Sequence, residues 1–408
     1  MTKKSSSFIN KNENNLRLDD SSIFGIDNVL SKLSGDHWKH VRSLLTPTFS
    51  TGKLRKMNSL MEPSIKNLLE ILGERAKKDQ PVDMNELFAR FSLDTIFSTM
   101  FGLQINSLKN ANESIFMHAK QLFKTMQQKP RWMYLLGLLS LLKHFGYRTA
   151  PKESVDYFMD LINEDFLQLM VRAKIDDSET DRETRGFKWS KKGLLLEEIL
   201  VQAFLFIFGF ENISNTMTYV AYCLAVHPDV QEKLIKEIDG TVGDHKVSYD
   251  NINELKYMDM VVNECGRLHA VIFRHERLCN ETTAVGDFVI QKGWDILVPV
   301  LAIHMDPDIW PEPEKFNPER FSAENSRGRH PSSYMPFGMG PRNCIAKRLA
   351  LVKIKTAIAS ILQHFRFTPC VETQIPLIKN QLNQPTLPIK LKVEKRHDSK
   401  EVPELLDY

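Results

Sequence analysis

The chain has 408 residues, of which 42% are hydrophobic and 26% are charged, and its formal net charge is +3. This composition is ordinary for a globular protein with a sizeable core, and the charge is too small to favour binding to nucleic acid. The cysteines are few and scattered without a CxxC pair, which argues against a disulfide framework and favours a reducing compartment: Cys223, Cys265, Cys279, Cys344 and Cys370.

Residues 1–34 are rich in Ser, Asn, Lys and Asp, and we expect this segment to be loosely ordered. It contains no apolar core long enough for a signal peptide or a membrane anchor. The apolar stretch over residues 132–142 is too short to span a bilayer. It is compatible with a buried helix or with a peripheral contact at a membrane interface.

From residue 35 onward, apolar residues recur at helical spacing, first over residues 54–76 and then over residues 82–102. The polar residues 174–192 predict a surface connection. A single long helix over residues 194–226 follows, and at 1.5 Å per residue it would be ~50 Å long and cross the whole domain. Pro228 suits the first turn of the next helix.

Only short strands are expected. Residues 286–300 predict a hairpin, and the alternating segment 387–395 (LPIKLKVEK) predicts a strand. The proline-rich residues 305–321 predict an irregular but ordered coil, because their aromatic side chains need burial. The predicted fold is therefore mainly α with small β-sheets.

Residues 336–346 read PFGMGPRNCIA and place Cys344 just before a helical pattern. A thiolate is favoured at a helix N-terminus and beside an arginine, and a thiolate binds metals or attacks carbon. The alternative is a buried structural cysteine. Gly338 and Gly340 favour the functional interpretation, because glycines let the backbone pass close beneath a flat ligand.

Residues 337–346, FGMGPRNCIA, resemble the haem-binding signature of the cytochromes P-450, with Ala346 where glycine is commoner. The resemblance covers about residues 35–396 and is strongest to the vertebrate microsomal 3A subfamily, in segments such as WKHVRSLLTPTFSTGKLRKM and HPDVQEKLIKEID. It implies the cytochrome P-450 fold, in which a long distal helix covers the haem. It also implies that Cys344 is the thiolate ligand of the iron of haem b.

The same resemblance implies further cofactor-binding residues. WKHVR supplies Trp38 and Arg42, RHER supplies Arg277, and the cysteine loop supplies Arg342, all expected at the haem propionates. In the family, the E-x-x-R pair is buried with an arginine of a later PER segment and has a structural role. These residues are Glu264, Arg267 and Arg320 here.

The implied reaction is monooxygenation of lipophilic compounds, including steroids and xenobiotics, with O2 and NADPH-derived electrons. The implied electron donor is the membrane-bound NADPH–cytochrome P-450 reductase, with cytochrome b5 as a second candidate. The implied location is the cytoplasmic face of the endoplasmic reticulum membrane. In the fold that the resemblance implies, Lys39, Lys347 and Arg348 flank the proximal face of the haem, where they could steer an acidic redox partner.

The distal helix departs from the family pattern. Glu211 and Asn212 occupy the catalytic positions, and Asn212 replaces the threonine whose hydroxyl helps to protonate bound dioxygen. An asparagine donates and accepts hydrogen bonds but is not a hydroxyl relay. Phe208 replaces a small residue that makes room above the iron, so its ring narrows the oxygen site or is moved aside by a bend in the helix.

Other departures lie outside this helix. Residues 35–408 are expected to form the haem domain without the family's N-terminal anchor and first sheet and helix. The segment over residues 149–165 is shorter than the matching segment of the family. Ala270 replaces a proline of the 3A subfamily. Missing strands would leave sheet edges open. Two alternatives to the monooxygenase therefore remain: an inactive product with impaired haem binding, and a haem-thiolate peroxide isomerase.

Overall fold

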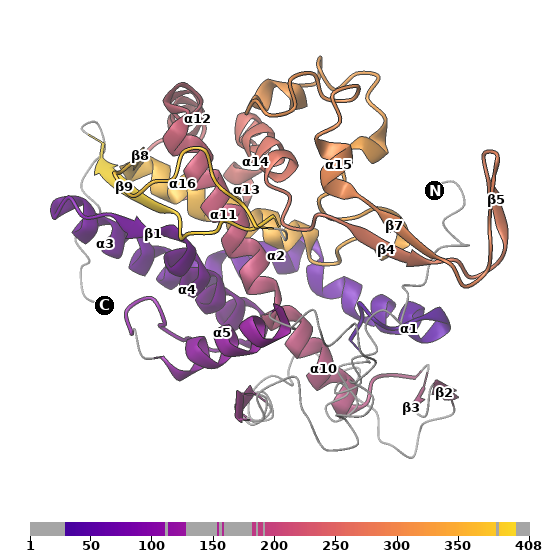
Figure 1. The fold of residues 1–408 in the computed structure, drawn as a ribbon. Helices are drawn as coiled ribbons and strands as arrows, with labels where there is room; N and C mark the ends of the chain where they lie inside the picture. Colours follow the sequence, from indigo (N-terminus) through magenta and orange to yellow (C-terminus); the bar gives the residue numbers. More distant parts are fainter. Residues whose placement is uncertain are drawn as a thin grey trace.

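The computed structural model describes residues 29–110, 113–127, 153–154, 157–158, 182–184, 187–190, 192–380 and 383–396. Within these residues the chain is mainly helical (Figure 1). The helices are α1 (Gly35–Leu45), α2 (Thr51–Leu60), α3 (Glu62–Lys77), α4 (Met84–Ile96), α5 (Ser114–Gln127), α10 (Leu196–Ile207), α11 (Gly209–Val226), α12 (Pro228–Thr241), α13 (Tyr249–Ile252), α14 (Lys256–Leu268), α15 (Val300–His304) and α16 (Lys347–His364).

The strands form small antiparallel sheets. They are β1 (Val82–Asp83), β2 (Arg182–Thr184), β3 (Phe187–Trp189), β4 (His275–Leu278), β5 (Thr283–Val285), β6 (Phe288–Ile290), β7 (Asp295–Val298), β8 (Phe365–Pro369) and β9 (Lys390–Lys395). One sheet has the order β1-β9-β8, and the pairs β2-β3, β4-β7 and β5-β6 form the others. The strand expected near the C-terminal end is confirmed as β9.

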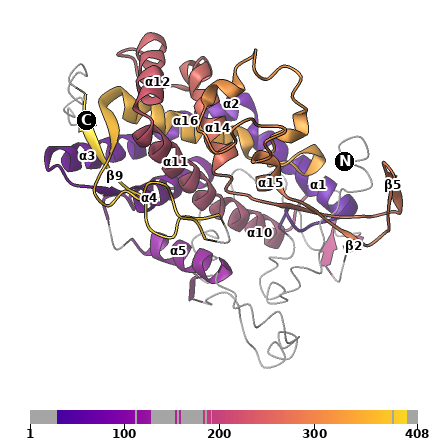
Figure 2. The same ribbon diagram turned by 45° about the horizontal axis from the view of Figure 1, so that its top comes forward.

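Helix α11 runs through the middle of the helical body, with α4, α14 and α16 around it (Figures 1 and 2). Most of its residues from Ile213 onward are buried, since apolar and small side chains cover nearly all of its circumference. The core is continuous from α1 through α16 to β9. The coil over residues 305–321 is ordered as predicted, and its Trp310 and Phe316 are buried.

The single helix predicted over residues 194–226 is wrong, because Phe208 separates α10 from α11. Phe208 has φ −60° and ψ −16°, and its amide still donates to the carbonyl of Phe204 at 3.0 Å. The two helices therefore continue in much the same direction (Figure 2). The next residue, Gly209, is a poor helix former at ~1 kcal/mol relative to alanine, which makes this a weak point of the pattern.

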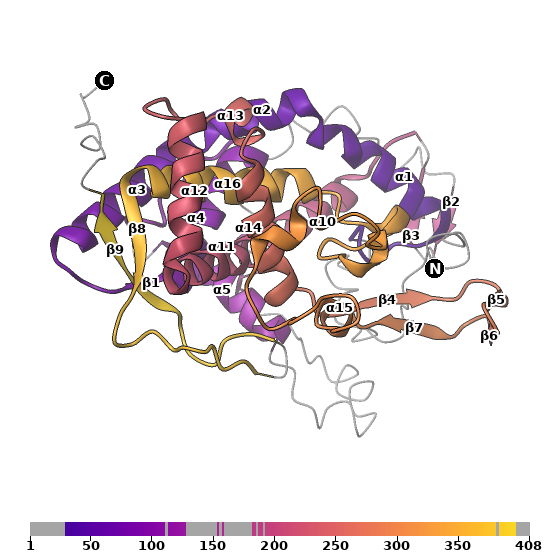
Figure 3. The ribbon, with the colours of Figure 1, turned by 90° about the horizontal axis from the view of Figure 1, so that it is seen from above.

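The hairpin predicted over residues 286–300 is also wrong in its pairing. Strand β6 pairs with β5 across a two-residue turn, in which Gly286 has φ +59°, and β7 pairs with β4 instead. The positive φ at Gly286 suits a tight turn at residues 286–287, which lies at the start of the predicted hairpin and not in its middle. The β4-β7 ribbon, with β5-β6 at its tip, extends away from the helices (Figure 3).

The polar segment 174–192, predicted as a surface connection, contains the β2-β3 pair. Trp189 at its end is buried, and its ring stacks on His37 of α1 with centroids 4.6 Å apart. Residues 1–28 and 132–142 lie outside the described residues, as does most of 149–165. Among residues 29–34, expected to be loosely ordered, Val29, Leu30 and Leu33 are buried. No helix in the described ranges is long and apolar enough to cross a membrane.

The burial of Lys353 in α16 lowers the stability of the folded protein. The side chain is fully buried, and its Nζ has no hydrogen-bond partner among the described residues. Burial lowers the pKa of Lys353 well below its ordinary value of 10.5. The unfolded chain keeps the ordinary pKa, so between the two pKa values the unfolded state binds more protons than the native state, which destabilises the native state relative to it.

We therefore expect Lys353→Met, which keeps the length and removes the amine, to raise the free energy of unfolding by about 1–3 kcal/mol at neutral pH. The part of the gain that comes from protonation should shrink as the pH rises and vanish above about pH 10.5, where both states hold a neutral amine. Urea titrations at several pH values measure this. Lys355→Met is the control, because Lys355 pairs with Asp259 at 2.9 Å and its loss should lower stability. An unchanged or lower stability for Lys353→Met would contradict the argument.

Candidate functional site

The loop before α16 turns sharply around two glycines. Gly338 and Gly340 have φ +71° and +73°, and a Cβ on Gly338 would lie 3.4 Å from Nε2 of His275. Both conformation and space therefore favour glycine at position 338. The amide of Cys344 donates to the carbonyl of Phe337 at 2.8 Å, which closes the loop and presents the thiol just before α16.

The Cys344 side chain is accessible to solvent, although nearby protein still desolvates it. Burial raises the pKa of this thiol above its ordinary value, while the Ala346 amide and the charges of Arg42 and Lys347 act in the opposite direction. The sequence indicated the stabilisation near the helix N-terminus, but the arginine that acts on the thiol is Arg42 and not the adjacent Arg342, and these groups together do not outweigh desolvation. Coordination to a metal ion would supply the missing stabilisation of the thiolate.

Arg42 and Arg342 connect this loop to α1. Arg42 donates to the carbonyl and to Oδ1 of Asn343, at 2.9 and 2.7 Å. Arg342 donates to the carbonyl of Leu33 at 2.6 Å, and its guanidinium lies 4.0 Å from the ring centroid of Trp38. Trp38 and Arg42, one turn apart on α1, therefore both lie against the residues that flank Cys344.

Three arginines converge here. The pKa of Arg342 is lowered to about 9, mainly by burial and further by the positive charges of Arg277 and Arg42. Burial also lowers the pKa of Arg277, which β4 contributes. Repulsion among three partly buried cations is relieved by an anionic ligand, and arginine binds carboxylates well. A thiol can bind a metal ion and the three arginines can bind carboxylates, so these residues fit haem, which carries both iron and two carboxylates.

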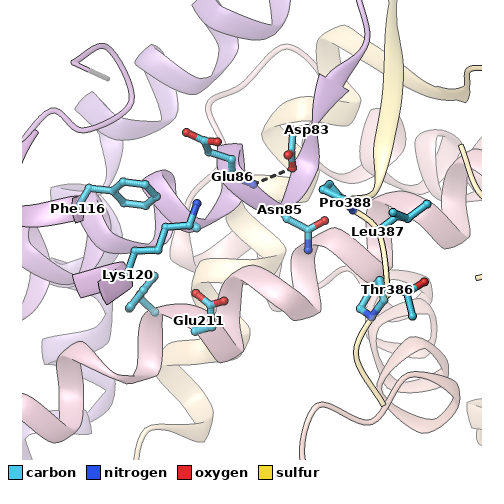
Figure 4. A pocket seen from close by; sticks show the side chains of 12 residues that line it. Asp83, Asn85, Glu86, Phe116, Lys120, Glu211, Thr386, Leu387 and Pro388 are labelled. Carbon is cyan, nitrogen blue, oxygen red and sulfur yellow. Dashed lines mark hydrogen bonds between the residues drawn. The ribbon is translucent and has the colours of Figure 1, made fainter. Parts of the chain in front are cut away.

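Glu211 lies apart from this group. It lines a pocket of about 300 Å³ between α4, α5, α11 and the segment 385–388 (Figure 4). Burial raises the pKa of Glu211, and the positive charge of Lys120 opposes that increase. The neighbouring Asn212 is exposed. Since consecutive helical residues point about 100° apart, the two predicted catalytic side chains have different surroundings.

The model of the family described as Cytochrome P450 matches residues 2–393. The chain belongs to the cytochrome P450 family. Cytochrome P450 3A41 of Mus musculus is 38% identical over 398 residues, which cover 91% of this chain and 77% of the relative. Cytochrome P450 3A29 of Sus scrofa is 38% identical over 387 residues, which cover 90% of this chain and 75% of the relative.

Cytochrome P450 3A40 of Oryzias latipes is also similar, with 38% identity over 392 residues that cover 91% of this chain and 76% of that protein. The resemblance to the 3A subfamily and the mainly α cytochrome P450 fold are thus confirmed. Membership of the family implies a haem cofactor and a haem-thiolate monooxygenase, to which the residues around Cys344 are suited.

The E-x-x-R cluster of this cytochrome P450 is assembled as predicted. Arg267 binds both oxygens of Glu264, at 2.7 and 2.8 Å, and Nε of Arg320 lies 3.2 Å from Oε1 of Glu264. Both Glu264 and Arg267 are fully buried. Glu264 also accepts the amide of Asn317 at 2.9 Å, so one carboxylate holds α14 and the proline-rich coil together.

Some residues of this cytochrome P450 site were not identified from the sequence. Asn343 holds Arg42, and its place directly before Cys344 was a usable signal. Lys120 faces Glu211 from another helix, and nothing local marks it. His37 and Glu198 form a buried pair, with 2.6 Å between Nε2 and Oε1, that joins α1 to α10. Tertiary packing alone brings these two together.

Proposed function

We propose that this cytochrome P450 oxidises lipophilic substrates, including steroids and xenobiotics, with O2 and electrons that originate from NADPH. The observation that carries the proposal is the convergence of three arginines and Trp38 on the loop that presents Cys344. Haem b, when bound, would supply the reductive activation of O2 and the insertion of one oxygen atom into the substrate.

In this proposal, Cys344 is the proximal ligand of the haem iron. Arg42, Arg277 and Arg342 hold the two propionates, with Trp38 beneath Arg342. Charge-assisted hydrogen bonds of this kind are stronger than neutral ones and fix the orientation of a carboxylate. The arginines thereby exchange mutual repulsion for pairing with anions.

Glu211 and Asn212 are the proposed proton-handling residues of the distal helix. Burial brings the pKa of Glu211 upward, so its carboxyl can take up a proton from water in the pocket and release it again. The amide of Asn212 can hold a water molecule by donating and accepting hydrogen bonds. It cannot relay a proton through a hydroxyl, which the family's threonine does.

The proposed electron donor is NADPH–cytochrome P450 reductase, with cytochrome b5 as a second donor, at the cytoplasmic face of the endoplasmic reticulum. A peripheral membrane contact fits this location. Of the proposed docking residues, Lys347 is exposed, Lys39 pairs with Asp36 at 3.1 Å, and Arg348 donates to Thr51 at 2.8 Å. An acidic partner would therefore compete with existing contacts at two of the three positions.

Two measurements test the proposal. The carbon monoxide complex of the reduced protein should show the red-shifted Soret band of a thiolate-ligated haem, and reductase with NADPH should then support steroid hydroxylation. A thiolate-type band with peroxide rearrangement and no NADPH-dependent turnover would identify the peroxide isomerase instead. Absence of haem after expression with haem supplementation would identify the inactive product.

Asn212→Thr restores the hydroxyl at the proposed proton-relay position. We expect it to raise the ratio of product formed to NADPH consumed by about tenfold, because a positioned proton donor typically contributes that much or more. Asn215→Thr is the matched control, since it makes the same change one turn further along α11. An equal ratio in the wild type and the Asn212→Thr variant would show that Asn212 does not limit proton delivery.

A further inference from the structure

Two histidines contact the same residue at the entrance of the cysteine loop. Nε2 of His304 lies 3.0 Å from the amide nitrogen of Met335, and Nε2 of His275 lies 3.3 Å from the carbonyl oxygen of the same residue. His304 ends α15 and His275 begins β4, so the two rings come from different elements. Met335 itself is buried.

The hydrogen-bond chemistry assigns a tautomer to each ring. The amide of Met335 is a donor, so Nε2 of His304 must accept and its proton must be on Nδ1. The carbonyl of Met335 accepts, so Nε2 of His275 must carry the proton. His304 is fully buried, and burial lowers its pKa to about 4, which keeps the accepting nitrogen free of a second proton at neutral pH.

The contacts lead from Met335 to Cys344 in two short steps. The carbonyl of Met335 also accepts the amide of Gly338 at 3.0 Å, which forms the turn after it. Within that turn, the carbonyl of Phe337 accepts the amide of Cys344 at 2.8 Å. A displacement of Met335 therefore moves the turn that sets the position of the thiol.

His304 is also connected to the buried cluster of Glu264, Arg267 and Arg320. Arg267, held by Glu264, donates to the backbone carbonyl of His304 at 2.8 Å. The ring of His304 also packs on Tyr334, with centroids 5.3 Å apart. His304 is thus fixed both at its backbone and at its ring, which suits a residue that must hold another.

His275 adds a second link to the same site. On β4, His275 and Arg277 are two residues apart and so lie on the same face of the strand. The ring of His275 also lies against Gly338, where an added Cβ would be 3.4 Å from Nε2. One short strand therefore contacts the cysteine loop and supplies an arginine of the proposed propionate site.

We propose that His275 and His304 are positioning residues that hold the backbone of Met335 from both sides and thereby fix the loop that presents Cys344. The consequence for iron ligation rests on the function proposed above, whereas the effect on the loop does not. This separation allows the two to be tested independently, through amide exchange in the loop and through the spectrum of the haem.

The first experiment compares His304→Leu with His304→Gln by amide hydrogen exchange over residues 335–344 in the full chain. The leucine removes the acceptor, whereas the glutamine oxygen can replace it. We expect exchange of the Met335, Gly338 and Cys344 amides to rise by about tenfold in His304→Leu and to stay near the wild-type rate in His304→Gln. His269→Leu is the control, because His269 is also buried but stacks on Tyr219 instead.

The second experiment records the Soret band of the reduced carbon monoxide complex for the same variants. We expect a larger fraction of haem without thiolate ligation in His304→Leu than in His269→Leu. This difference should hold when the two variants have lost the same amount of thermal stability. Equal exchange and equal spectra in these two variants would overturn the proposal. If His304→Leu does not fold, the half-buried His275→Leu, compared with His275→Gln, decides by the same readouts.

The outcomes also separate the two proposals. Faster amide exchange in the histidine-to-leucine variants, with no thiolate-type band even in the wild type, would support the positioning role of His275 and His304 and reject the proposed function. A thiolate-type band in the wild type, with amide exchange unchanged in His304→Leu and His275→Leu, would support the proposed function and reject the positioning role of the two histidines.

Discussion

Replacing Glu264 with glutamine is expected to destabilise the protein by about 3–5 kcal/mol, because it leaves buried arginines without their carboxylate. Glu264 and Arg267 are fully buried, and Arg320 is only 9% exposed. The neutral amide can still accept hydrogen bonds, but it cannot compensate two positive charges. Chemical denaturation of the purified protein measures the loss.

The effect should extend beyond stability. Glu264 binds the amide of Asn317, and Arg267 binds the carbonyl of His304, so the carboxylate supports both the proline-rich coil and the residue that contacts the cysteine loop. Glu312→Gln is the control, because Glu312 lies in the same coil but its pair with Lys315 is exposed to solvent. A similar midpoint of denaturation for the two variants would refute a special role for the buried cluster.

Cys344→Ala is expected to abolish the thiolate-type Soret band, because no other side chain in the loop can supply a thiolate. Its cost in stability should be small, within roughly 0.5 kcal/mol before haem is added, since the Cys344 side chain is accessible to solvent. Difference spectra and thermal unfolding, recorded on the same preparation, separate loss of the ligand from loss of the fold.

Cys370→Ala is the matched control for this experiment. Cys370 is a partly accessible thiol near β8, and its backbone and sulfur contact Thr373. We expect the Cys370→Ala spectrum to equal that of the wild type. A thiolate-type band that persists in Cys344→Ala would assign the iron to another residue and remove the basis of the proposed function.

Local patterns in the sequence were sufficient for much of this molecule. Helical periodicity located α3, α4 and α12, and proline at the first turn of α12 marked its start. The glycines and the arginine before Cys344 marked the loop, because its backbone conformation depends on residues close together in the chain. The E-x-x-R and W-x-x-x-R pairs were also readable, since three or four residues bring side chains to one helix face.

The remainder depended on contacts between segments far apart in the chain. The pairing of β7 with β4 and the burial of Trp189 both follow from packing that no local pattern encodes. The direction of the Cys344 pKa shift likewise depends on contacts between distant segments. The helix N-terminus beside the thiol was visible in the sequence, but the position of Arg42 and the desolvation both depend on how the whole fold surrounds the thiol.

The same distinction applies to the histidines. In the sequence, His275 and His304 are isolated residues 60 and 31 positions before Met335. They meet at the backbone of one residue only because β4 and α15 pack beside the cysteine loop. Periodicity and motif spacing report neighbours along the chain, whereas a hydrogen bond to a distant backbone atom requires the fold to be complete.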